Sequence, residues 1–134
     1  MATAKISYVQ GLRTEAIHLE SKAAIITAAP KDNNGDGSLF SPTDLAATSL
    51  ASCMLTVMGI YANNNGMSLG DINCEMTKVM ADTPRRIAKI VLNIQWKTTL
   101  NEKQINTLKK IGLNCPVAKS LHPDIIQEVN FEIN

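Results

Sequence analysis

Two cysteines, Cys53 and Cys115, are the residues of this 134-residue chain best suited to covalent chemistry. Cys53 lies in an uncharged stretch from Leu45 to Ala62, where burial raises the pKa of a thiol and leaves it inert unless a cation is near. Cys115 directly precedes Pro116 at the predicted start of a helix, where free backbone N–H groups favour a thiolate. The local sequence therefore predicts that Cys115 is the more reactive thiol.

Other interpretations of the cysteines remain open at this point. Cys53 and Cys115 could be two unrelated core residues, because free cysteine is among the most buried residue types. A metal site made of Cys53, Cys115 and His122 is disfavoured, because these residues lack the sequence spacing of metal-ligand pairs. Cys74 shares a strand face with Ile72, so we expect it in the core, where a thiol without a charge partner behaves as a small hydrophobe.

The element that positions Cys53 is a predicted helix from Ser41 to Gly66. Ser41 is a suitable N-cap, and Pro42 then occupies the first helical position. Asp44 stands three residues after Ser41, which is an acidic variant of the capping box. Gly66 follows three asparagines and supplies the left-handed conformation that ends many helices.

Because this helix has no charge between Leu45 and Ala62, it is expected in a core or in a membrane. Its length is at the short limit of a membrane span, it contains several hydroxyl residues, and no basic cluster flanks it. We therefore expect no membrane association. A chain of this size has little sheet to cover such a helix, which predicts a partner subunit.

The remaining periodicity predicts a single α+β domain over residues 1–134. Alternation of polar and apolar residues predicts strands, and a wider spacing with capping residues predicts two further helices. Gly112 is expected to end the first of these helices. The expected strands are 4–10, 13–19, 22–28, 70–80, 87–97 and 128–134, and the further helices are 101–112 and 115–121.

Arg13 shares one face of its predicted strand with Ile17 and Leu19, so we expect it on the core side. The loop at residues 30–38 begins like a calcium-binding loop, but the position that needs a closing glutamate is Thr43. We interpret it as a surface loop whose Asp and Asn side chains cap their own backbone.

Composition excludes several functional classes. The formal net charge is +1 and only 4% of residues are aromatic, so neither a nucleic-acid footprint nor a base-stacking surface is indicated. Three cysteines without paired short spacing argue against a disulfide framework and favour a reducing compartment, which predicts the cytoplasm.

The chain carries two motifs, Ser41-Pro42-Thr43-Asp44-Leu45 followed by Cys53, and the run N-C-P-V-x-K-S-L at 114–121. Together these motifs resemble the OsmC/Ohr family of thiol peroxidases. The order of strands and helices also resembles that family over essentially the whole chain. The resemblance implies an OsmC-like fold in which antiparallel sheets wrap around long central helices in an intertwined homodimer.

The resemblance also implies roles for individual residues. Cys53 matches the peroxidatic cysteine, Cys115 the resolving cysteine, and Arg13 the arginine that activates the peroxidatic thiol. Family peroxidases commonly carry a glutamate ten residues before the peroxidatic cysteine, and that position is Thr43 here. Asp44 follows it but points about 100° away on a helix, so Thr43 and Asp44 are both candidates to orient Arg13.

The implied reaction is reduction of an organic hydroperoxide at Cys53, formation of a disulfide with Cys115, and its reduction by an external dithiol, as part of oxidative or osmotic stress defence. It requires no cofactor and no metal. The alternative is an OsmC-like protein without peroxidase turnover that binds a small apolar ligand or reacts with electrophiles.

Overall fold

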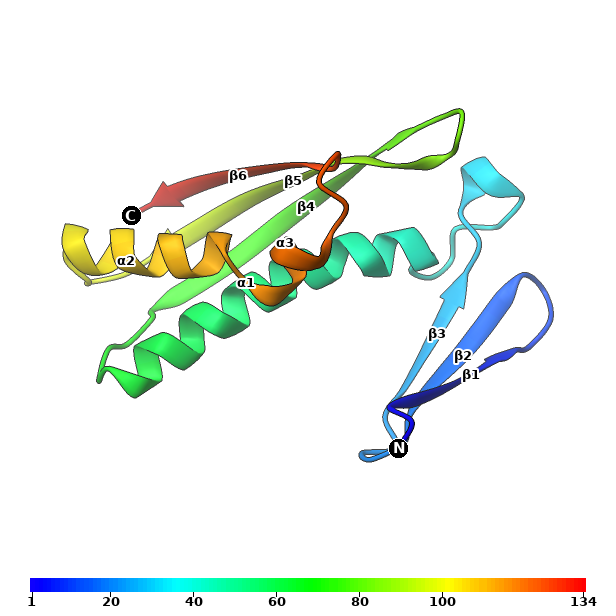
Figure 1. Ribbon diagram of the computed structural model, residues 1–134, viewed down its shortest axis with the longest axis horizontal. Coiled ribbons are helices and arrows are strands. Elements are labelled where there is room, and N and C mark those ends of the chain that lie inside the picture. The colour runs from blue at the N-terminus through cyan, green and yellow to red at the C-terminus, as the bar shows by residue number, and fades with distance from the viewer. The chain divides into compact units, whose positions relative to one another are not determined.

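The computed structural model describes residues 1–134 and divides the chain into two compact units, Met1–Ala46 and Ala47–Asn134. Figure 1 labels the helices and strands of both units. The long helix α1, Pro42–Asn64, begins in the first unit and runs through the second. Each unit is described by itself below.

Helix α1 has the N-terminal cap that its sequence predicts, and it ends at Asn64, two residues before the predicted Gly66. The Asp44 N–H donates to Ser41 Oγ at 3.0 Å, and the Ser41 N–H donates to Asp44 Oδ2 at 2.9 Å. These reciprocal bonds form the predicted capping box and satisfy two N–H groups that the helix cannot satisfy internally. Ser41 is only 1% exposed, so its hydroxyl is a buried polar group with a partner.

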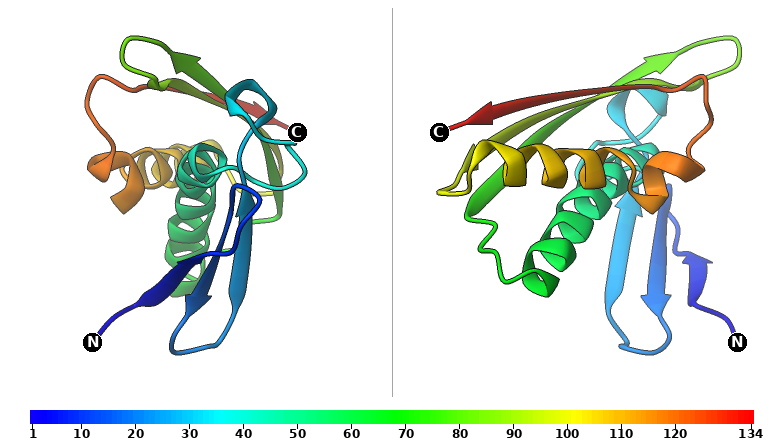
Figure 2. Two further views of the ribbon diagram at one scale, coloured as in Figure 1. Left: turned by 90° about the vertical axis from the view of Figure 1, so that its right-hand side faces the viewer. Right: turned by 60° about the vertical axis from the view of Figure 1, so that its left-hand side comes forward.

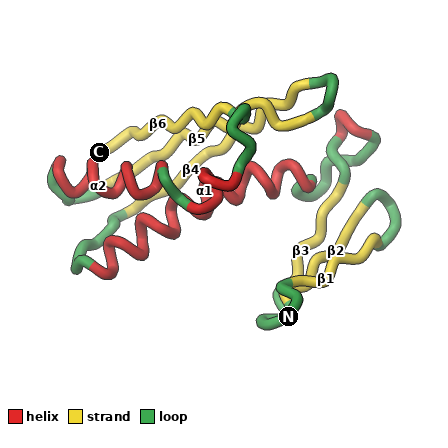
Figure 3. The backbone as a smooth tube through the Cα atoms, in the orientation of Figure 1, coloured by secondary structure: helices red, strands yellow, loops and turns green.

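The second unit contains a three-stranded sheet of β4, Asp71–Ala81, β5, Arg86–Lys97, and β6, Ile126–Ile133. Figure 3 shows the three strands running side by side in the order β4-β5-β6. β4 and β5 pair antiparallel, whereas β5 and β6 pair parallel. The α+β class is confirmed. The parallel pair arises because the chain crosses between β5 and β6 through two helices rather than a tight turn.

The crossover consists of α2, Glu102–Leu113, and α3, Pro116–Ser120. Figure 2 shows that α1 and α2 lie on the same face of the sheet. An Asn101–Gln104 capping box starts α2. The expectation that Gly112 ends this helix is wrong, because α2 continues to Leu113 and its C-cap is Asn114. Gly112 has a packing role instead, described below.

The core of the second unit lies between the sheet and the helices. β5 is the central strand, and its residues Ile90, Leu92, Ile94 and Trp96 are at most 1% exposed. Their spacing of two places all four on the helix-covered face, as the alternation predicts. α1 contributes a buried stripe made of Ala47, Leu50, Met54, Met58 and Ala62.

The opposite side of α1 is not buried in a single chain. Ser52 and Thr56 are exposed there, and Ile60 is 54% exposed. α1 is the one helix long and apolar enough to cross a membrane by length and composition. Its buried stripe packs into the core together with β5, as in the core helix of a globular domain.

The first unit is a three-stranded antiparallel sheet of β1, Ala4–Tyr8, β2, Arg13–His18, and β3, Ala24–Ala28, followed by the short 3-10 helix η1, Lys31–Asn33. The three strands confirm the order that the alternation predicts. Almost none of this sheet is buried. Thr27 and Ala28 are its buried strand residues. Large apolar side chains that remain exposed in this unit include Ile6, Tyr8, Ile25, Ile26 and Phe40.

Candidate functional site

The second unit brings Cys53 and Cys115 together. Cys53 lies in the middle of α1, and Cys115 lies in the short connection between α2 and α3. The Cys53 side chain lies close enough to Cys115 to raise its pKa through a hydrogen-bonding and a charge interaction, although 61 intervening residues separate the two in the sequence. Both cysteines are free in this structure.

Cys115 is positioned by the turn between the two short elements. Its N–H donates to the Gly112 carbonyl at 3.1 Å, and its Sγ accepts from the Ala118 N–H at 3.4 Å as the N-cap of α3. Pro116 follows at the first helical position, where its missing N–H costs nothing. Cys115 is therefore held by bonds at both its backbone and its sulfur.

Burial raises the pKa of the Cys115 thiol above its usual value. The Ala118 N–H lowers the pKa, but the hydrogen bond and charge repulsion from Cys53 raise it further, because two thiolates in contact repel each other. The pKa of Cys115 is therefore raised, whereas the helix start alone predicts that it is lowered. Only 1% of Cys115 is exposed, whereas Cys53 is partly exposed. Desolvation raises the pKa of Cys115 by more than the N–H groups at the helix start lower it.

Cys74 faces the core from β4, as predicted. It is partly buried, packs against the core cluster, and has its pKa raised chiefly by burial. Glu75 raises the pKa further, and no cation contributes to lowering it. Its environment is that of a structural thiol.

Gly112 allows α2 to approach α1 closely beside the thiol pair. A Cβ added at Gly112 would lie 2.8 Å from both Met54 Cγ and Met58 Sδ. Replacing Gly112 by alanine gains about 1 kcal/mol of helix propensity but overpacks this contact, at a cost of about 1–3 kcal/mol. We expect Gly112→Ala to lower the free energy of unfolding in urea by up to about 2 kcal/mol and to slow formation of the Cys53–Cys115 disulfide.

Gly59 in α1 is the matched control, because an added Cβ there meets no atom of the same chain within 4 Å. Gly59→Ala is expected to leave the stability unchanged or to raise it by up to about 1 kcal/mol. Equal stability of the Gly112→Ala variant and the wild type, with an unchanged rate of disulfide formation, would contradict the packing role of Gly112.

Arg13 belongs to a polar cluster within the first unit. Its Nη2 donates to Asp36 Oδ2 at 3.2 Å and to Ser38 Oγ at 2.9 Å. Asp36 Oδ1 in turn accepts from both the N–H and the hydroxyl of Ser38, at 2.9 and 2.7 Å. The interpretation of this loop as one whose Asp side chain caps its own backbone is confirmed at Asp36. The same carboxylate also holds Arg13, which the sequence did not indicate.

Thr43 and Asp44 lie at the start of α1. The Asp44 carboxylate accepts from the Ser41 N–H, and the Thr43 hydroxyl is within 3.2 Å of the Ser41 hydroxyl. The carboxylate that contacts Arg13 in its polar cluster belongs to Asp36. Sequence reasoning missed Asp36 and Ser38, because Asp36-Gly37-Ser38 carries only a turn signal and stands 23 residues from Arg13.

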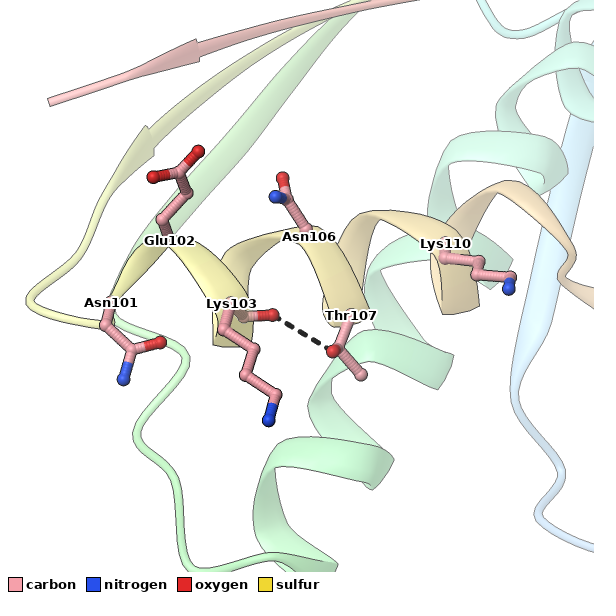
Figure 4. Close-up of a pocket in the computed structure, with 6 residues that line it drawn as sticks. All are labelled: Asn101, Glu102, Lys103, Asn106, Thr107 and Lys110. Atoms are coloured by element: carbon pink, nitrogen blue, oxygen red, sulfur yellow. Dashed lines mark hydrogen bonds between the residues drawn. The ribbon is translucent and has the colours of Figure 1, made fainter.

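A surface hollow follows the outer side of α2, and Figure 4 shows its six lining residues. Asn101 is the N-cap of α2, the other five lie on α2 from its first residue to its last turn, and the drawn hydrogen bond joins the Thr107 hydroxyl to the Lys103 carbonyl. No thiol lines this hollow, so it is separate from the cysteine pair. Its lining residues are Asn101, Glu102, Lys103, Asn106, Thr107 and Lys110.

Comparison with known proteins identifies the family. The sequence pattern of the OsmC-like protein family matches residues 35–130, which is more than half of the chain. The chain belongs to the OsmC-like protein family. A solved structure from Psychrobacter arcticus, of a protein named for osmotic stress induction and detoxification response, is 49% identical. The match covers 98% of this chain and 96% of that chain, with a TM-score of 0.93.

More distant structures share the OsmC-like fold. An organic hydroperoxide resistance protein OsmC from Legionella pneumophila is 19% identical with a TM-score of 0.72, and the match covers 98% of each chain. An organic hydroperoxide resistance protein from Vibrio cholerae, solved with captopril in one of its active sites, is 17% identical with a TM-score of 0.73. That match covers 98% of this chain and 92% of that chain. None of the curated proteins compared with the chain matches it.

Family membership explains why α1 has an apolar composition. In this OsmC-like protein the helix with the composition of a membrane span is the core helix of a soluble fold. The predictions of an α+β class and of the OsmC/Ohr family are confirmed. Membership also supports a stress-related redox protein as its general function.

Proposed function

We propose that this OsmC-like protein is a cysteine-based peroxidase that reduces organic hydroperoxides, with Cys53 as the attacking thiol, Cys115 as the resolving thiol and Arg13 as the activating cation. The proximity of Cys53 and Cys115, which is close enough for Cys53 to act on the pKa of Cys115, is the observation that carries this proposal. The named roles of the hydroperoxide resistance relatives from Legionella and Vibrio point in the same direction.

The two thiols differ in ways that support this order of roles. Cys53 is partly exposed, whereas Cys115 is buried. Burial and the neighbouring Cys53 raise the pKa of Cys115, so Cys115 tends to keep its proton beside a Cys53 thiolate. The thiolate is the nucleophile in cysteine chemistry, and we therefore assign the first step to Cys53.

The proposed cycle has three steps. The Cys53 thiolate attacks the peroxide O–O bond, the sulfur is oxidised to a sulfenic acid, and the alkoxide leaves and takes up a proton to become the alcohol. The Cys115 thiol then attacks the Cys53 sulfur, forming the disulfide and releasing water. An external dithiol reduces the disulfide by two thiol exchanges and is itself oxidised to a disulfide. The Arg13 guanidinium, with its fork of N–H donors, would hold the thiolate and polarise the peroxide.

We further propose that residues 1–134 act as one OsmC-like domain within an intertwined homodimer in the cytoplasm. Exposed apolar residues of the first unit, such as Ile25 and Phe40, need cover that this unit does not supply. The side of α1 around Ile60 has the same need. A second copy of the chain would supply both, and the three free thiols are compatible with a reducing compartment.

Counting free thiols after peroxide treatment tests the proposed function. One equivalent of cumene hydroperoxide is expected to remove two of the three thiols of the wild type, because Cys53 and Cys115 become a disulfide while Cys74 stays reduced. Cys53→Ser is expected to lose none. A wild type that keeps all three thiols would overturn the peroxidase proposal and favour an OsmC-like protein that binds an apolar ligand or reacts with electrophiles.

A further inference from the structure

Gln127 is a polar exception on the core-facing side of β6. The other side chains on that side, Val129, Phe131 and Ile133, are apolar and pack against the core. In the parallel pairing of the two strands, Gln127 stands beside Ile90 of β5, which is fully buried. A half-buried amide costs free energy unless it is hydrogen bonded, so the partner of Gln127 indicates what this side chain does.

The partner of Gln127 is Ala118 in α3. Gln127 Nε2 donates to the Ala118 carbonyl at 3.1 Å. The N–H of the same alanine donates to Cys115 Sγ at 3.4 Å. Ala118 therefore links an amide on the sheet to the sulfur of Cys115, and both contacts lie within the second unit.

Helix α3 is too short to fix its own orientation. It has five residues, and an isolated helix of this length is unstable because starting a helix is costly. Two of its carbonyls have local partners: Pro116 accepts from the Ser120 hydroxyl at 2.8 Å, and Val117 accepts from the Leu121 N–H at 3.0 Å. Gln127 supplies a bond from the sheet instead. This bond ties α3 to the body of the second unit.

The position of the Ala118 N–H matters for the ionisation of Cys115. Burial raises the pKa of this thiol, and among the contributions that lower the pKa the Ala118 N–H is larger than the Val117 N–H. Cys53 on α1 is the ionisable neighbour that acts on the thiol. A hydrogen bond to a charged acceptor is stronger than one to a neutral acceptor, so the N–H favours the thiolate. Displacing it would leave less Cys115 thiolate at a given pH.

We propose that Gln127 is a positioning residue for the resolving thiol: through Ala118 it holds an N–H donor on Cys115 Sγ and so raises the fraction of Cys115 that can attack the oxidised Cys53. This inference rests on the function proposed above. Because Gln127 acts through Ala118 on Cys115, its effect belongs to the resolving step and not to the first attack on the peroxide.

A direct test follows the ionisation of Cys115 in a chain where it is the one remaining thiol. In the full chain with Cys53→Ser and Cys74→Ser, the ultraviolet absorbance of the thiolate against pH reports Cys115 alone, with the thiol-free chain as the blank. Adding Gln127→Met keeps the size of the side chain but removes its donor. We expect the titration to move to higher pH, so that the thiolate fraction below the midpoint falls by roughly threefold, which corresponds to part of one hydrogen bond.

A second test separates the two steps at the thiol pair. After one equivalent of cumene hydroperoxide without added thiol, rapid quenching and mass spectrometry follow the Cys53 sulfenic acid and its conversion into the disulfide. In Gln127→Met the sulfenic acid should form at the wild-type rate and persist roughly threefold longer, because less Cys115 is thiolate. Gln127→His should restore both readouts, since its ring Nε2 can donate at about the same reach as the amide.

Gln95 on β5 provides the matched control. Its Nε2 donates to Glu132 Oε2 at 2.9 Å at an exposed site, so Gln95→Met makes the same chemical change without touching α3. Both readouts should keep their wild-type values in this variant. Where Gln127→Met does not fold, Gln127→Asn withdraws the donor by one methylene and is expected to act in the same direction.

Two results would overturn the proposal. One is an unchanged Cys115 titration in folded Gln127→Met or Gln127→Asn. The other is equal slowing of sulfenic acid formation and of its conversion, because the effect would then be one of general stability. Failure of the proposed function has a different signature. In that case wild-type Cys53 forms no sulfenic acid, while the titration of Cys115 still reports whether Gln127 acts on this thiol.

Discussion

Replacement of Cys115 by serine is expected to stop peroxide reduction after a single turnover, whereas replacement of Cys53 by serine abolishes it from the start. In Cys115→Ser the Cys53 thiolate still attacks the peroxide, but its sulfenic acid meets no thiol partner. One equivalent of peroxide should be consumed for each chain, and a dimedone adduct should form on Cys53. In Cys53→Ser the remaining nucleophile is buried and has a raised pKa.

The measurement is peroxide consumption, with dithiothreitol for turnover of the wild type and without any added thiol for Cys115→Ser, because dithiothreitol would itself reduce the sulfenic acid. Mass spectrometry after trapping with dimedone follows. Cys74→Ser is the matched control, because Cys74 belongs to the core face of β4, and it should change neither the rate nor the stoichiometry. Reversed phenotypes, with Cys53→Ser retaining one turnover, would assign the attack to Cys115. Higher pH should speed the resolving step, because the pKa of Cys115 is raised and more of it becomes thiolate as pH increases.

The second large effect concerns stability. Trp96 on β5 is 1% exposed, its Nε1 donates to the Leu69 carbonyl at 2.7 Å, and its ring lies 6.3 Å from that of Phe131. Trp96→Ala removes the largest core side chain and leaves a cavity, which costs about 3–5 kcal/mol. Because domains are stable by only about 5–15 kcal/mol, we expect this substitution to remove a large share of the free energy of unfolding.

Trp96→Phe separates packing from hydrogen bonding. It retains an aromatic ring but leaves the Leu69 carbonyl without its donor, so we expect a loss of about 1–3 kcal/mol. Trp96 is the one tryptophan, so urea unfolding should be followed by circular dichroism rather than by fluorescence, at fixed chain concentration. Equal stability of Trp96→Ala and the wild type would show that this core residue is not needed for packing.

The sequence by itself determined the features that depend on neighbours in the chain. The start of α1 follows from a capping box whose two partners are three residues apart, and that box forms as predicted. The inward face of β5 follows from strict alternation, which sets the face of every second residue. The α+β class followed from the order of such elements, and the two cysteine motifs indicated the family.

Only the tertiary structure decided the properties that depend on distant segments. The sequence predicted that Gly112 ends a helix. In the structure Gly112 has no side chain where Met54 and Met58 of another helix pack against it. The position of Cys115 at a helix start predicted a lowered pKa. Its pKa is instead raised by burial and by Cys53, which packing brings near. Arg13 finds its carboxylate in Asp36 across 23 residues, where no periodicity links them. Such contacts depend on the path of the chain in three dimensions, and local patterns carry no information about it.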